Sequence, residues 1–144
     1  MDVFSKEKRS RIMSRIGGKD TKPELLVRSL LHSMGYRFRI QRKDLPGNPD
    51  IILPKYKKVI FVHGCFWHGH AGCSRSKRPD TNMEFWNKKI DGNMERDKYN
   101  IQRLEDSGWM TLTLWTCEIK DQEALKNRLL SFLETDQHKQ ETLN

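Results

Sequence analysis

The chain has 144 residues, of which 32% are charged, and its formal net charge is +8. This length allows one domain with a substantial core. We see no long apolar span and no apolar leader, so we expect neither a membrane helix nor a signal peptide. Three cysteines, an odd number, argue against a disulfide framework and for a reducing compartment, so we predict a cytoplasmic protein.

The excess positive charge is concentrated near the N-terminus. The first 43 residues hold twelve Lys or Arg and four Asp or Glu, whereas the other 101 hold fifteen of each kind. Such a segment suits attraction to a polyanion such as nucleic acid. A solvated basic face without a partner is the alternative.

Residues 5–16 predict a short basic helix that ends at the Gly17-Gly18 pair. Its apolar members include Met13, and they either rest on the core or insert between DNA base steps as an apolar wedge. We treat residues 1–20 as a basic DNA-binding arm.

A second helix is predicted to open at the pattern T-x-x-E, residues 21–24, and to end at Gly35. This pattern is a capping box, so Glu24 has a sufficient structural role, and the residues alone favour that role over catalysis. Residues 36–40 alternate like a strand. The expected buried side of the helix consists of Leu26, Val27, Leu30, Leu31 and Met34.

Residues 50–53 and 58–62 predict two strands joined by a turn at 54–57. Folding the hairpin about Tyr56 would place Asp50 opposite Val62 and His63. An Asp at the start of a strand is usually a turn or capping residue. Its predicted neighbours favour a metal-ligand role here.

Residues 59–73 read VIFVHGCFWHGHAGC, an apolar run that turns into a cluster of metal-ligand side chains. Cys65, His70 and Cys73 at this spacing, with the distant Cys117, predict a closed Cys3His zinc site. Ordinary buried thiols are the alternative. A closed site has no open position for water, so His63 and His68 are left as candidates for acid–base chemistry.

Residues 82–107 predict a long helix, followed by a strand at 110–115 and a last helix at 122–133. Asp97 falls inside the apolar stripe of the long helix, where a carboxylate is costly without a partner. Phe85 and Trp86 are favoured as core residues. The apolar stripe consists of Trp86, Ile90, Met94, Ile101 and Leu104.

We therefore predict one α/β domain over residues 1–144, with a central mixed sheet flanked by helices and a disordered tail at 134–144. Asp and His side chains beside a basic arm indicate Mg²⁺-assisted hydrolysis of a phosphodiester. A zinc-stabilised nucleic-acid-binding module without catalysis is the alternative, and Asp97 argues against it.

The order of basic arm, TKPE, LPGNPD, VIFVHGCFWHGH, FW…NMERD and LWTC resembles the very short patch repair (Vsr-type) mismatch endonucleases over residues 5–133. The resemblance implies a restriction-endonuclease-like core with a structural zinc, and a Mg²⁺-dependent nick 5′ of the T in a T:G mismatch. The chain also departs from the PD-(D/E)xK pattern, because Pro49-Asp50 is followed by Val62-His63-Gly64 where an acid and a lysine are expected.

The resemblance also implies a role for each site residue. Asp50 and the Val62 carbonyl would bind Mg²⁺, His68 would activate water with Asp97 as its partner, His63 would assist at the phosphate, and Glu24 would support metal-bound water. The DNA wedge would consist of Phe66, Trp67 and Trp86, with Met13 entering from the other groove. The expected partners are double-stranded DNA with a T:G mismatch and mismatch-repair proteins, and the chain is expected to be a monomer. A restriction-linked nuclease that cuts paired or modified DNA remains open, because specificity would lie in the wedge and its loops.

Overall fold

The computed structural model describes residues 22–135. The chain divides into two compact units, Met1–Tyr36 and Arg37–Asn144. The helix expected at 5–16, Met13 and nearly all of the predicted tail lie outside the described residues. In the part of the chain that is described, every helix is too short or too polar to cross a bilayer.

The first unit contributes helix α2, Lys22–Ser33. Val27 and Leu31, one helical turn apart, are fully buried, as the apolar pattern predicts. The helix ends where Gly35 takes a left-handed conformation with φ +85°, and the Tyr36 amide then donates to the Leu31 carbonyl at 3.1 Å.

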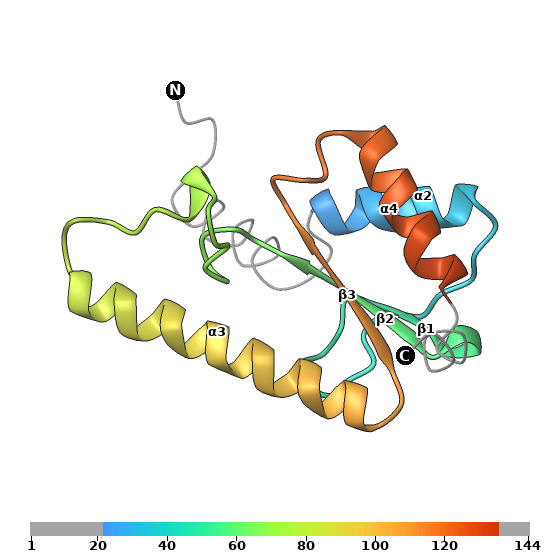
Figure 1. Cartoon of the computed structure of the whole chain (residues 1–144), viewed down its shortest axis with the longest axis horizontal. Helices are drawn as coiled ribbons and strands as arrows, with labels where there is room; N and C mark the ends of the chain where they lie inside the picture. The colour runs from blue at the N-terminus through green and yellow to red at the C-terminus, as the bar shows by residue number, and fades with distance from the viewer. Residues whose placement is uncertain (1–21, 136–144) are drawn as a thin grey trace, which may run out of the picture. The chain divides into compact units, whose positions relative to one another are not determined.

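The second unit is built on a three-stranded mixed sheet (Figure 1). Strand β2, Lys58–His63, lies between β1, Ile51–Leu53, and β3, Met110–Trp115. It pairs antiparallel with β1 and parallel with β3. Every residue of β2 is buried, as its apolar run requires of a central strand. The predicted mixed sheet with helices is confirmed.

The pairing of β1 with β2 is shifted by one residue from the predicted pairing. A turn centred on Tyr56 would pair Ile52 with Ile60, but the structure pairs Ile52 with Val59. The reason is the turn itself, a 3₁₀ helix over Pro54–Tyr56 that is closed by Lys57 in the left-handed region.

The prediction of a strand at residues 36–40 is wrong. Only Arg39 pairs with β1, as an isolated bridge in which its amide and carbonyl bond to Ile52 at 2.7 and 2.9 Å. Ile40 is 37% exposed and Gln41 has φ +58°, so this segment has no buried face to extend the pairing.

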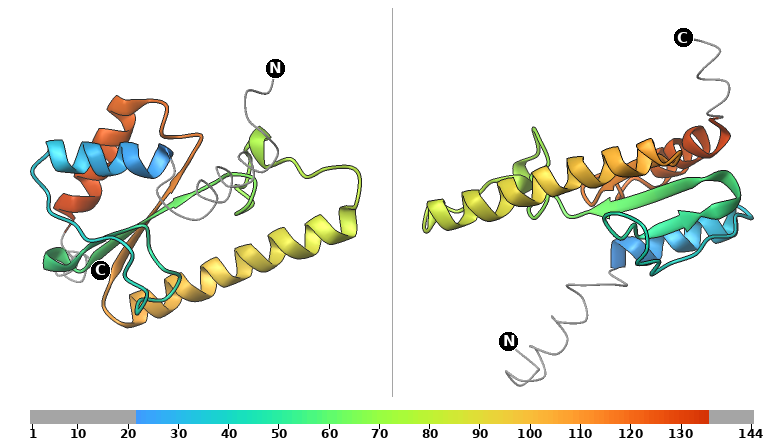
Figure 2. Two further views of the ribbon diagram at one scale, coloured as in Figure 1. Left: turned by 180° about the vertical axis from the view of Figure 1, so that it is seen from behind. Right: turned by 90° about the horizontal axis from the view of Figure 1, so that it is seen from below.

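Helix α3, Met83–Asp106, is the crossover between the parallel strands β2 and β3. Its C-terminal half packs on the sheet, where Leu104 joins Val59, Phe61 and Trp109 in one apolar cluster. Its N-terminal half extends past the end of the sheet beside segment 64–82 (Figure 2).

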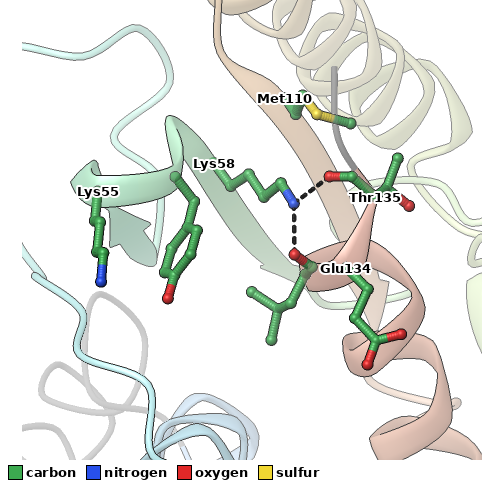
Figure 3. Close-up of a pocket in the computed structure, with 7 residues that line it drawn as sticks. Lys55, Lys58, Met110, Glu134 and Thr135 are labelled. Atoms are coloured by element: carbon green, nitrogen blue, oxygen red, sulfur yellow. Dashed lines mark hydrogen bonds between the residues drawn. The ribbon is translucent and has the colours of Figure 1, made fainter. Parts of the chain in front are cut away.

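Helix α4, Gln122–Glu134, begins at Asp121, whose carboxylate accepts from the Ala124 amide at 3.1 Å. At its other end Lys58, only 4% exposed, donates from Nζ to the carbonyls of Phe132, Leu133 and Thr135 at 2.8, 2.8 and 2.5 Å. Figure 3 shows this lysine at an open pocket of about 410 Å³. Val59 faces α3 and Lys58 faces α4, so the alternation of β2 places the two helices on opposite faces of the sheet.

Candidate active site

The parallel strands β2 and β3 end together, with His63 paired to Trp115. The loop after β2 carries His68, and the ring of His68 stacks on that of His63 with centroids 3.8 Å apart and planes 4° from parallel. Asp97 of α3 reaches both rings. Its Oδ2 lies 2.7 Å from His68 Nδ1 and 3.9 Å from His63 Nδ1. The structure thus brings together three predicted site residues from separate elements.

The hydrogen bond to Asp97 defines how His68 can act. A carboxylate is an acceptor, so His68 Nδ1 carries a proton, and in the neutral form of the ring Nε2 then presents a lone pair. A fixed tautomer with a free Nε2 is the arrangement of a general base. Asp97 is therefore a partner of His68, which accounts for a carboxylate within an apolar helical stripe.

The surroundings of His63 determine its charge. Burial and the neighbouring His68 lower the pKa of His63 to about 4, although Asp97 acts in the opposite direction. His63 is therefore neutral near pH 7. A neutral imidazole can donate a hydrogen bond to a phosphate oxygen without adding a charge beside His68.

His63, His68 and Asp97 offer three ligand atoms within 4.8 Å of one another. Two parallel rings, however, direct their lone pairs side by side, whereas a shared metal requires them to converge on one point. The stacked geometry fits acid–base chemistry better than chelation.

Asp50 leads into β1 and lies beside the end of β2. Its Oδ2 accepts a hydrogen bond from the Val62 amide at 2.6 Å. The predicted neighbourhood of Asp50 and Val62 is therefore present, despite the shift in register. A carboxylate next to the backbone of this strand supplies the oxygen donors that Mg²⁺ prefers, so these residues fit a site for that ion.

A second group of ligands follows directly. Cys65, His70, Cys73 and Cys117 place their ligand atoms within 4.8 Å of one another, and Cys117 Sγ lies 3.4 Å from His70 Nδ1. Tetrahedral zinc with Zn–S bonds of about 2.3 Å needs sulfur atoms about 3.8 Å apart. The three cysteines form no disulfide, and the donor set fits a closed structural zinc site.

The acidities of the thiols fit a cation as well. Burial would raise the pKa of Cys65, but hydrogen bonds involving Thr116, Cys117 and His70 outweigh it and lower that pKa to about 6. Partial burial and the neighbouring thiols raise the pKa of Cys117 to about 11. Cys65 therefore favours the thiolate and Cys117 the thiol, and a divalent cation would be needed to stabilise the thiolate of Cys117 as well.

An aromatic cluster lies next to these ligands. Trp86 contacts Phe66, Trp67 and Phe85, with ring centroids 5.4, 5.8 and 5.1 Å apart. Trp67 is 48% exposed and Phe85 59% exposed, so the expectation that Phe85 belongs to the core is wrong. The reason is that the first turns of α3 extend beyond the sheet, so no described strand lies against them. Exposed rings in a cluster suit stacking on nucleic-acid bases.

Comparison with known proteins agrees with this geometry. A profile of the family described as DNA mismatch endonuclease Vsr matches residues 1–75. The chain is 47% identical over 133 residues to the type II nicking enzyme V.XorIIP of Xanthomonas oryzae pv. oryzae, covering 92% of this chain and 97% of that protein. It is 44% identical over 130 residues to the DNA mismatch endonuclease Vsr of Escherichia coli K12, covering 90% and 83%. The chain belongs to the Vsr family of DNA endonucleases.

The fold has a solved counterpart in the catalytic domain of the homing endonuclease I-Bth0305I. The TM-score is 0.54 at 24% identity, and the match covers 78% of this chain and 94% of that domain. At this identity the likeness concerns the fold. The resemblance to the Vsr family that the motifs indicated is confirmed by the closer relatives.

Two further predicted site residues of this Vsr-family chain belong to the first unit, Met1–Tyr36. Glu24 lies in the first unit, 6% exposed, and its Oε2 is 3.3 Å from Arg28 Nη2. Its support of metal-bound water stays a prediction, as does the wedge role of Met13, which lies outside the described residues.

One residue of the Vsr-family site was missed in the sequence. Trp115 stacks on His70 at 4.2 Å and meets the ring of His63 edge-on at 5.4 Å, so it lies between the Cys3His group and the histidine pair. The available signal was the motif LWTC, in which Trp115 ends β3 two residues before Cys117.

Proposed function

We propose that this Vsr-family endonuclease nicks one DNA strand 5′ of the T in a T:G mismatch, in very short patch mismatch repair, with Mg²⁺ at the reacting phosphate. The observation that carries the proposal is the His63–His68 stack held by Asp97, in which His63 directly follows Val62, the residue whose amide bonds to Asp50. The family, whose members include proteins named as mismatch endonuclease and nicking enzymes, supports the substrate.

The chain's own residues divide the chemistry among them. Asp50 and the Val62 carbonyl would hold Mg²⁺, which supplies positive charge to the phosphate. His68 takes a proton from the attacking water at Nε2, and Asp97 holds its tautomer and stabilises the imidazolium that forms. His63, neutral and buried, donates to a phosphate oxygen.

Zinc, the second metal of the proposal, would have a structural role. Zinc held by Cys65, His70, Cys73 and Cys117 would fix the loop that carries His68, because a closed four-ligand site stabilises a fold without joining the reaction. Phe66, Trp67 and Trp86 would insert at the mismatch from this loop and from α3. The core would be of the restriction-endonuclease type, acting as a monomer in the cytoplasm alongside mismatch-repair proteins.

The test is a nicking assay on an end-labelled duplex with one T:G mismatch and on a fully paired control, in Mg²⁺ and in EDTA. We expect one cut beside the T, in Mg²⁺ only, and its loss in Asp50→Ala and His68→Ala while bound zinc is retained. Equal cutting of both duplexes would point instead to a nuclease of paired DNA. Binding without any cut would contradict the proposed chemistry.

A further inference from the structure

Three consecutive residues of the loop after β2 rest on one face of α3. The Trp67 carbonyl accepts from Asn93 Nδ2 at 2.9 Å, and His68 bonds to Asp97. Gly69, with φ +62°, lies so close to α3 that a Cβ there would be 2.5 Å from Met94 Sδ. The contacting helix positions are 93, 94 and 97, which share one side of a helix.

Asn93 is held in the orientation that this contact needs. Its Oδ1 accepts a hydrogen bond from Arg96 Nη2, so its Nδ2 is directed to the Trp67 carbonyl. The oxygen and the nitrogen of the amide thus each have a partner. These partners fix the side chain and identify which atom is the oxygen and which is the nitrogen.

The two hydrogen bonds link the two proposed functions of the loop. Trp67 belongs to the exposed aromatic cluster, and the next residue, His68, is the proposed base. Asn93 and Asp97 lie one helical turn apart, about 6 Å along α3. Any movement of the Trp67 backbone as its ring meets DNA is therefore resisted at Asn93, directly beside the point where Asp97 orients His68.

We propose that Asn93 is a positioning residue that couples the seating of Trp67 in the mismatch to the alignment of His68. This inference rests on the proposed function, in which Trp67 contacts DNA and His68 activates water. Without the Asn93 bond the ring can still insert, but the peptide between Trp67 and His68 is free to shift, and a displacement of about 1 Å can cost about 100-fold in rate.

The experiment measures insertion and chemistry separately on the full chain with zinc present. A duplex with 2-aminopurine next to the T:G mismatch reports insertion as a rise in fluorescence, and single-turnover nicking at saturating DNA reports chemistry. We expect Asn93→Ala to keep the fluorescence rise and a Kd within about threefold of wild type, while nicking slows at least 10-fold.

Two further variants sharpen the comparison. Asn93→Asp keeps the acceptor for Arg96 but removes the donor to Trp67, so it should be as slow as Asn93→Ala. Gln102→Ala removes an exposed amide of the same helix that bonds only to Asp106 among the described residues, and it should nick like wild type.

The outcomes are distinct. Unchanged nicking in Asn93→Ala, or a weaker Kd with an unchanged rate at saturation, would overturn the inference, the latter by making Asn93 a DNA contact. Loss of both signals with a lowered Tm would overturn it too, by showing a purely structural role. If wild-type protein cuts another duplex but not T:G, the proposed substrate fails, and the same comparison on that duplex still tests Asn93.

Discussion

At the scale of single residues, one carboxylate oxygen organises the proposed active site. Asp97 lies on α3, outside the strand and loop that carry the two histidines. Its Oδ2 bonds to His68 and lies 3.9 Å from His63 Nδ1. A carboxylate in this position holds the tautomer of His68 and lies beside the imidazolium that would form when His68 takes a proton. His63, whose pKa is lowered to about 4 by burial and by His68, is a weak base.

We predict that Asp97→Asn slows nicking on the order of 10³-fold or more, because the amide can stabilise the wrong tautomer of His68 and cannot stabilise the imidazolium. The measurement is the single-turnover rate at saturating mismatched DNA. The matched control is Asp91→Asn on the same helix, whose carboxylate bonds to Arg78 and is 60% exposed. Equal rates for the two variants would contradict the role given to Asp97.

At the scale of elements, the attachment of α4 depends on a charge buried in the sheet. Lys58 begins β2 and donates to three carbonyls at the end of α4, where the helix leaves acceptors without partners of its own. The lysine lies at the opposite end of β2 from His63, about 16 Å away at the usual rise of a strand. Lys58 therefore contributes to the stability of the fold.

We predict that Lys58→Met lowers the free energy of unfolding by about 2 kcal/mol, since it removes charge-assisted hydrogen bonds and keeps a similar side-chain length. Urea unfolding, followed by tryptophan fluorescence, measures the change. Lys55→Met in the neighbouring exposed turn serves as the control and should stay within about 0.5 kcal/mol of wild type. A similar loss in both variants would assign the effect to surface charge.

At the scale of the whole molecule, the charge is distributed unevenly. Residues 1–20 hold six Lys or Arg and three Asp or Glu, and the chain after residue 43 is balanced. Contacts between basic side chains and phosphates release counterions, so they weaken as salt rises. The basic segment should therefore supply affinity for DNA that is independent of sequence.

We predict that deletion of residues 1–20 weakens DNA binding and makes the dependence of log K on log salt shallower by about three units, as expected for the loss of a few phosphate contacts. Fluorescence anisotropy between about 50 and 200 mM salt measures both quantities. A truncation of residues 136–144, which hold one Lys and two acidic residues, is the control. An unchanged slope in the first deletion would show that the arm makes no phosphate contact.

Sequence by itself determined the elements with strong local signals and the family. The long helix, the last helix and the three strands follow from apolar periodicity, and the order of motifs indicated the Vsr family. The Cys3His group was identifiable from spacing, because three of its ligands lie within nine residues of one another. Such features depend on neighbours in the chain.

Only the tertiary structure decided the features that depend on distant pairing. Residues 36–40 form one bridge in place of a strand, because this segment has no buried face. The hairpin pairing is shifted by one residue through the geometry of its turn. The structure also shows that Phe85 is exposed and that Asn93 and Asp97 contact the loop that holds Trp67 and His68. Periodicity marks which side of a helix meets other groups, whereas the packing of α3 against that loop determines which groups they are.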